Sequence, residues 1–162
     1  MSSPGPGTSP PVALVPIGRV RGGRDDLTDD RWASVTARIE LDPDVVEESA
    51  TAGLDAFSHI EVVYLFDRVD PSGVCRGARR PRGRADLPEV GILAQRAKDR
   101  PNRIGVTTCA LLGVDGLVLG VAGLDAVDGT PVLDVKPHLS GFDPRGPVRE
   151  PAWALELMRD YW

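Results

Sequence analysis

The stretch ASVTARIEL, at residues 33–41, decides the fold class of this 162-residue chain. Its apolar side chains recur at every second position and face one side: Val35, Ala37, Ile39 and Leu41. The residues between them are polar or charged. An alternation of period two predicts a β-strand with one face buried and the other in water. We therefore expect a core built at least partly from a sheet.

Further strand-like stretches follow along the chain, separated by turn formers. We predict strands at 12–20, 59–66, 90–96, 104–114 and 128–139. Asp115-Gly116 stands between two apolar runs within residues 114–124, which is typical of a type I′ hairpin turn. Strands do not alternate with long helices, and no glycine-rich dinucleotide motif is present. This pattern favours an antiparallel barrel or closed sheet over a Rossmann fold.

Helical signals are few. Residues 45–54 can form at most a short helix, ended by Gly53, and PAWALELMRDYW at 151–162 predicts a docking helix. In that tail, Pro151 suits the first helical position, and the spacing of Trp153, Leu157 and Tyr161 forms an apolar stripe. The predicted fold is mainly β: a small antiparallel β-barrel with short peripheral helices and a C-terminal helix. It forms a single domain over 12–162, after a disordered lead at 1–11.

Charge and composition narrow the possible functions. The formal net charge is −5, so the whole molecule is not a general binder of polyanions, and any contact with RNA has to be local. Cys75 and Cys109 stand in unrelated contexts without a CxxC motif, which indicates a reduced cytosolic protein without a metal site. Neither a secretory signal nor a membrane span is apparent. We expect a soluble, cytoplasmic protein that binds no metal and no membrane.

Two polar segments have open interpretations. In LDAVDGTPVLDVKPH, at 124–138, the aspartates cannot all be buried without partners, because an unpaired buried carboxylate is too costly. Residues 128–131 are either a plain hairpin turn or the wall of a polar pocket. RAKDRPNRIG, at 96–105, is either a solvated charged loop or an anion clamp, with Pro101 fixing the backbone after Arg100. His59, where a loop enters the strand at 59–66, is by itself more often structural than catalytic.

Four motifs in order, PIGRV, LDAFSHIEVVYLF, RPNRIGV and LDAVDGTPVLDVKPH, cover about residues 13–140. Together they resemble the TsaA-like family, whose best-known members are the TrmO tRNA methyltransferases. The resemblance implies an S-adenosylmethionine-dependent methyltransferase on a small β-barrel, acting as a homodimer with the cofactor near the subunit boundary. It also implies a substrate, the threonylcarbamoyl-adenosine at position 37 of tRNA, methylated on N6.

The resemblance assigns site residues where the motifs match. The expected cofactor-binding residues are Phe57, Ser58, His59, Arg96, Arg100, Pro101, Asn102, Asp125, Asp128, Gly129, Thr130 and Pro131, and the expected catalytic residues are Asp134, Lys136 and His138. Such residues suit the chemistry, because a sulfonium favours carboxylates and a methionine carboxylate favours cations. N6 of the substrate base belongs to a urea-like group, so a base such as Lys136 or His138 would help by removing its proton.

The chain departs from the family pattern in three places. Arg103 stands where proline is usual, the segment 22–32 lacks a Pro-Arg-Gln-like sequence, and no extra C-terminal domain follows. An arginine-rich loop within 67–88 could contact tRNA in place of that domain, or could be solvated surface: Arg76, Arg79, Arg80, Arg82 and Arg84. Two alternatives therefore stay open. One is a methyltransferase acting on a small molecule, and the other is a non-catalytic module that binds S-adenosylmethionine or RNA.

Overall fold

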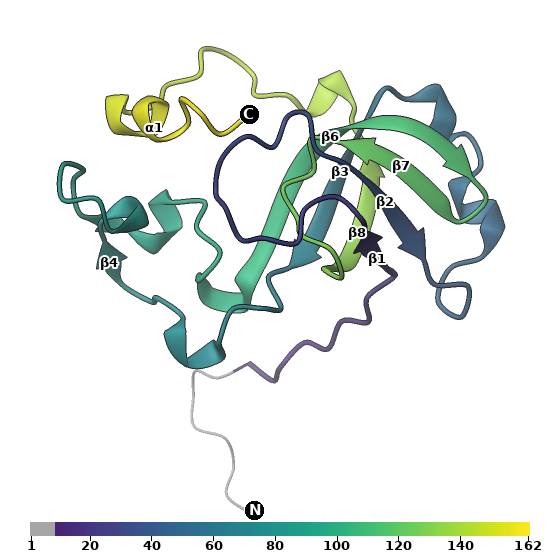
Figure 1. Cartoon of the computed structure of the whole chain (residues 1–162), viewed down its shortest axis with the longest axis horizontal. Helices are drawn as coiled ribbons and strands as arrows, with labels where there is room; N and C mark the ends of the chain where they lie inside the picture. The colour runs from purple at the N-terminus through teal and green to yellow at the C-terminus, as the bar shows by residue number, and fades with distance from the viewer. Residues whose placement is uncertain (1–8) are drawn as a thin grey trace, which may run out of the picture.

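Six antiparallel strands close into a barrel in the computed structural model, which describes residues 9–162 (Figure 1). Around the barrel the order is β1 (Gly18–Arg21), β2 (Thr36–Leu41), β7 (Val118–Ala122), β6 (Ile104–Asp115), β3 (His59–Leu65) and β8 (Pro131–Pro137). This architecture confirms the antiparallel barrel that the sequence predicts. Of the predicted disordered lead, residues 1–8 lie outside the described part, and 9–11 have no regular structure.

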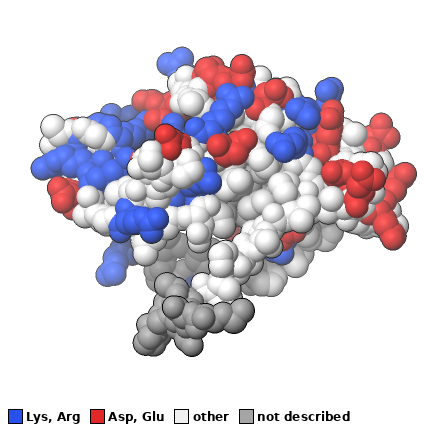
Figure 2. Space-filling model, turned by 90° about the horizontal axis from the view of Figure 1, so that it is seen from below, with Lys and Arg blue, Asp and Glu red and all other residues white. Residues whose placement is uncertain are grey.

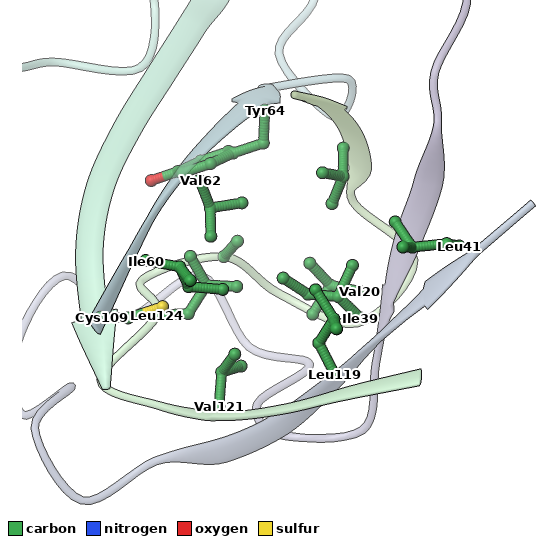
Figure 3. Packing of buried hydrophobic residues seen from close by; sticks show 12 residues of the cluster. Val20, Ile39, Leu41, Ile60, Val62, Tyr64, Cys109, Leu119, Val121 and Leu124 are labelled. Atoms are coloured by element: carbon green, nitrogen blue, oxygen red, sulfur yellow. The ribbon is translucent and has the colours of Figure 1, made fainter. Parts of the chain in front are cut away.

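The core fills the inside of the barrel with side chains from alternate strand positions (Figure 3). On β3, Ile60, Val62 and Tyr64 are buried, while the residues between them are more exposed. On β2, Ile39 and Leu41 point inward, as the alternation in ASVTARIEL predicts. Burial of these apolar and aromatic side chains is the main favourable term in folding.

Gly105 lets two aromatic rings pack at one end of the barrel. A Cβ atom at this position would lie 2.5 Å from Tyr64 Cε2 and 2.9 Å from Phe66 Cζ, closer than packed carbon atoms approach. With no side chain there, the Tyr64 and Phe66 rings meet edge to face, with centroids 5.3 Å apart.

The β6–β7 hairpin uses a different turn from the one expected. The last pair of the ladder is Asp115 with Val118, so the turn residues are Gly116 and Leu117. A type I′ turn needs positive φ at both turn residues, and of these two only Gly116 has one, at 56°. The prediction of a type I′ turn at Asp115-Gly116 is therefore wrong, although the hairpin itself is present.

Three predicted elements are shorter than expected. The first strand begins at Gly18 instead of residue 12, after Pro16, which has no N–H for a ladder. Residues 90–96 give only the two-residue β5 (Val90–Gly91) and a 3-10 turn, η5 (Ile92–Ala94). The Gln95 amide donates to backbone carbonyls nearby, which holds this segment in a turn. Residues 45–54 form no α-helix: 45–47 precede the 3-10 turn η1 (Glu48–Thr51), and the segment ends at the start of a second one, η2 (Leu54–Ala56).

Residues 71–103, here called the arm, stand beside the barrel (Figure 1). The arm contains η3 (Pro71–Gly73), β4 (Ala78–Arg79) paired with β5, η4 (Pro81–Gly83) and η6 (Pro101–Arg103). The prediction of a loop over 67–88 therefore holds apart from these short elements.

The C-terminal tail returns to the barrel after a short helix. The 3-10 turn η7 (Ser140–Phe142) precedes α1 (Ala152–Leu157), for which Pro151 is the N-cap and not the first helical residue. The predicted stripe reaching Tyr161 is wrong because the helix ends at Leu157. Instead, the tail carbonyls accept bonds from Arg31 N and Trp32 N, both at 2.9 Å. Among residues 9–162, no helix is long and apolar enough to cross a membrane.

Candidate functional site

Two of the sequence motifs meet at the end of β3. Phe66 N donates to Arg103 O at 2.8 Å, and Arg68 Nη2 donates to Asp128 O at 2.9 Å. The RPN segment (residues 96–105) and the DGTP segment (128–131) therefore flank the residues that follow the strand. A cavity of about 240 Å³ opens here, and we call it the strand-end pocket. Its lining combines apolar and charged side chains: Leu27, Phe66, Asp67, Arg68, Val69, Lys98 and Asp99.

The DGTP segment is a turn that lies next to this pocket without lining it. Asp128 Oδ1 accepts from Gly22 N at 2.8 Å, and Asp128 N donates to Arg24 O at 2.9 Å. Gly129 has a φ of 83° and donates its N–H to Val20 O, which fixes the turn to β1. Thr130 is buried, and Pro131 begins β8. The turn thus anchors residues 22–24 at the edge of the strand-end pocket.

The arginines of the RPN segment bind carbonyls. Arg100 Nη1 donates to Gln95 O at 2.6 Å, and Arg103 Nη1 folds back to Val69 O at 2.8 Å. Arg96 donates to Val106 O on β6. Asn102 adopts a left-handed φ of 64°, which is tolerated better by asparagine than by most residues. Arg103 therefore braces the arm against the chain after β3.

Asp125 is the centre of a hydroxyl cluster. Its Oδ1 accepts from Tyr64 at 2.9 Å and from the Thr107 hydroxyl, and its Oδ2 accepts from the Tyr161 hydroxyl of the tail. Burial, and then the Asp125 charge, raises the pKa of both tyrosines, so the phenols stay protonated and act as donors at neutral pH. The sequence singled out Asp125 but not its partners, because they lie far away along the chain.

Loss of the tail's bond to this cluster is expected to cost stability. Tyr161→Phe removes one hydrogen bond to a partly buried carboxylate while keeping the ring, so we expect the free energy of unfolding to fall by about 1.5 kcal/mol in urea denaturation. A double-mutant cycle with Asp125→Asn checks the cause. If the two effects simply add, the Tyr161 hydroxyl is not coupled to Asp125.

The FSH motif (residues 57–59), Lys136 and His138 lie at the other end of β3, and Asp134 pairs with Val63 in the middle of the strand. His59 begins the strand and its Nδ1 lies 2.8 Å from Ser58 Oγ, with Phe57 just before. Glu61 pairs with Lys136 across the β3–β8 ladder. A second cavity, of about 210 Å³, opens here and is lined by Glu61, Lys136, Pro137, Leu139 and Phe142.

Carboxylates surround the Lys136 and His138 side chains at this end. Lys136 Nζ lies 2.6 Å from Asp134 Oδ2, and this bond raises the pKa of Lys136, which favours the ammonium form. His138 lies between two carboxylates, with Nδ1 3.3 Å from Glu61 Oε1 and Nε2 3.2 Å from Asp143 Oδ1. His138 therefore has partners on both ring nitrogens.

One chain does not bring all the motifs into one pocket. Glu61 and Phe66 are five residues apart along an extended strand, which separates the two ends by about 17 Å at 3.3 Å per residue. A proton transfer needs contact within one hydrogen bond or one water. The residues of the FSH end thus cannot serve a reaction in the strand-end pocket of the same chain.

Most of the arginine-rich loop is internally bonded. Three of its arginines pair with carboxylates and one with a carbonyl: Arg79 with Asp99, Arg82 with Asp30, Arg84 with Asp86, and Arg80 with Leu87 O. Arg76 alone of the five has no such partner among residues 9–162. Within the same range, no cluster of three His, Cys, Asp or Glu side chains could hold a metal ion.

Charge is nevertheless divided strongly between the arm and the rest of the chain. The arm holds nine Lys and Arg against three Asp and Glu, a net charge of +6, so the remaining residues carry −11. Figure 2 shows blue side chains gathered at the end of the molecule where Figure 1 places the arm, and red ones at the opposite end. The negative net charge of the whole chain therefore does not exclude a basic surface on the arm.

Comparison with known proteins gives a consistent assignment. The family model described as the N-terminal domain of tRNA-methyltransferase O matches residues 29–144. A human protein named tRNA (adenine(37)-N6)-methyltransferase is 34% identical over 113 residues, which cover 70% of this chain and 25% of that protein. A Methanothermobacter thermautotrophicus protein named as a probable S-adenosyl-L-methionine-binding protein is 35% identical over 142 residues, covering 83% and 96% of the two chains.

A solved structure gives the same fold. The crystal structure of TrmO from Pseudomonas aeruginosa superposes with a TM-score of 0.69 and 28% identity, over 86% of this chain and 61% of that one. The chain thus spans about a quarter of the human relative's length and under two thirds of the bacterial structure.

Proposed function

Because this chain belongs to the TrmO family of tRNA methyltransferases, we propose that it methylates N6 of adenosine 37 in tRNA, using S-adenosylmethionine. The finer proposal is that the acceptor is the threonylcarbamoyl form of that base. The observation that carries the proposal is the strand-end pocket, where the RPN and DGTP segments meet. A tRNA substrate would place the protein in the cytoplasm.

The lining of the strand-end pocket fits the parts of this cofactor. Phe66 and Leu27 offer an apolar surface for an adenine ring. Asp67 and Asp99 can accept bonds from a ribose diol or an ammonium, and Arg68 or Lys98 can bind a methionine carboxylate. The cofactor would supply the electrophilic methyl group for an in-line displacement, in which positioning provides much of the rate.

Of the two proposed bases, His138 suits a proton transfer better than Lys136. The ion pair with Asp134 holds Lys136 as an ammonium, whereas Glu61 and Asp143 can orient the His138 ring. Lys136 would instead stabilise negative charge that develops on the urea-like group, with Asp134 positioning it. The Lys136→Met variant is therefore expected to keep the rise of the single-turnover rate with pH, whereas His138→Phe is expected to lose it, because a general base acts only in its deprotonated form. Equal profiles for the two variants would reject His138 as the base.

A homodimer would bring the two ends of the site together. We propose that the His138 end of one subunit completes the strand-end pocket of its partner, because about 17 Å separates the two ends within one chain. Exposed apolar side chains near the His138 end support a contact surface there: Leu139 and Phe142.

One assay tests the activity. Purified protein is incubated with S-adenosylmethionine labelled in its methyl group and threonine tRNA, and the nucleosides are analysed by mass spectrometry. We expect methylated threonylcarbamoyl-adenosine. A matched tRNA with guanosine at position 37 is the control and should remain unlabelled. Absence of methyl transfer to any tRNA, at low salt and with bound cofactor demonstrated, would reject the tRNA proposal.

A small-molecule acceptor is the second candidate. The observation that favours it is the internal bonding of four of the five loop arginines, which reduces their availability for phosphates. Label appearing in a small metabolite from a cell extract, with none in tRNA, would support this candidate.

A further inference from the structure

The loop at residues 22–31 is held at both ends and has an exposed tip. Asp128 binds its start through Gly22 and Arg24, and Arg82 binds its end through Asp30. Inside the loop, the Arg24 guanidinium donates to three backbone carbonyls and lies 4.1 Å over the Trp32 ring. The loop therefore keeps its own shape, and residues 25–28 form its tip over the strand-end pocket.

Among the described residues, one side-chain ion pair joins this tip to the pocket. Arg68 Nη2 lies 2.9 Å from Asp25 Oδ1, and Arg68 Nη1 donates to Asp25 O at 3.1 Å. The side chains are 42% and 81% exposed, so water and salt weaken the pair. Leu27, in the same tip, lines the pocket.

Arg68 does not need Asp25 to keep its place. Its Nη2 also donates to Asp128 O at 2.9 Å, which ties the guanidinium to the DGTP turn. Loss of the Asp25 carboxylate would therefore leave a positioned cation at the edge of the pocket. A planar guanidinium of this kind binds carboxylates through two parallel hydrogen bonds.

We propose that Asp25 is an internal competitor for the carboxylate of an amino-acid-bearing ligand. In this scheme, which rests on the proposed function, the ligand's carboxylate displaces Asp25 from Arg68, and the tip moves with it. The exchange makes Arg68 the residue that distinguishes the intact cofactor and its product from adenosine derivatives without the amino-acid part. Asp25 thus lowers the affinity of the pocket for a ligand that carries this carboxylate.

Binding calorimetry on the full chain tests this exchange with two probes. S-adenosylhomocysteine carries the carboxylate, and 5′-methylthioadenosine lacks it. Asp25→Asn is expected to lower the Kd for S-adenosylhomocysteine about threefold to fivefold, because the competing charge is gone, and to leave the Kd for 5′-methylthioadenosine unchanged. Arg68→Ala is expected to raise the first Kd about tenfold and not the second.

Asp26→Asn is the matched control. It makes the same charge change in the same tip, yet its side chain caps Thr28 N at 3.0 Å and does not contact Arg68. We expect the Kd for either probe to change less than twofold. An Asp25→Asn variant that binds S-adenosylhomocysteine no tighter than the unmodified chain overturns the competition. If the unmodified chain binds neither probe, the proposed function fails and the inference fails with it.

Discussion

A one-to-one mixture of two inactive variants is expected to recover about a quarter of the unmodified rate of methyl transfer. The first variant, Arg68→Glu, places a negative charge against the ligand carboxylate, and the second, His138→Phe, removes the proposed base. Each alone should lower the single-turnover rate about 100-fold or more. If a site takes Arg68 from one subunit and His138 from the other, each mixed dimer has one intact site, and random pairing makes half of all dimers mixed.

A chain carrying both changes provides the control for this experiment. Mixed with the unmodified chain, it should leave about a quarter of the rate if sites are shared between subunits, because every mixed dimer then lacks an intact site. If each site lies within one chain, about half of the rate would remain. Failure of the two single variants to exceed their separate activities, after mixing and subunit exchange, would contradict the shared site.

The fold could be predicted from the sequence where a local pattern determines the structure. Ile39 and Leu41 face the core because alternation along an extended chain admits no other common arrangement. The same reasoning failed for residues 90–96, because a short apolar run does not distinguish a strand from a turn that buries Ile92. The side chain of Gln95, which bonds two carbonyls there, decides the outcome, and no periodicity reveals it.

The motifs of the candidate site could be found, but their placement depends on the length and register of β3. Glu61 pairs with Lys136, and this register puts the FSH end and the DGTP turn at opposite ends of the strand. The partners of Asp125 were missed for a related reason. Tyr161 is 36 residues away and Tyr64 is 61, so only the folded chain brings their hydroxyls to one carboxylate. Likewise, Asp30 neutralises Arg82 across 52 residues.

Raising the salt concentration from 50 to 200 mM is expected to weaken tRNA binding about 50- to 150-fold. Six of the nine arm cations have no carboxylate partner in the described residues: Arg76, Arg80, Arg96, Lys98, Arg100 and Arg103. If about four of them meet phosphates, counterion release gives a slope of roughly −2.8 to −3.6 in a plot of log affinity against log salt. Fluorescence anisotropy of labelled threonine tRNA, titrated with protein at several salt concentrations, measures this slope.

Arg76 and Lys98 are the arm cations to remove first, because among residues 9–162 neither side chain has a hydrogen-bond or ion-pair partner whose loss would disturb the fold. Replacing both with alanine should make the salt slope shallower by about 1.5 to 2 and weaken binding at 50 mM salt. Arg21→Ala with Arg38→Ala removes two cations outside the arm, both paired with Glu40, and should leave the slope unchanged. Equal slopes for the two double variants would mean that the arm does not contact the phosphates. An unmodified chain that binds no tRNA at 50 mM salt would favour the small-molecule acceptor.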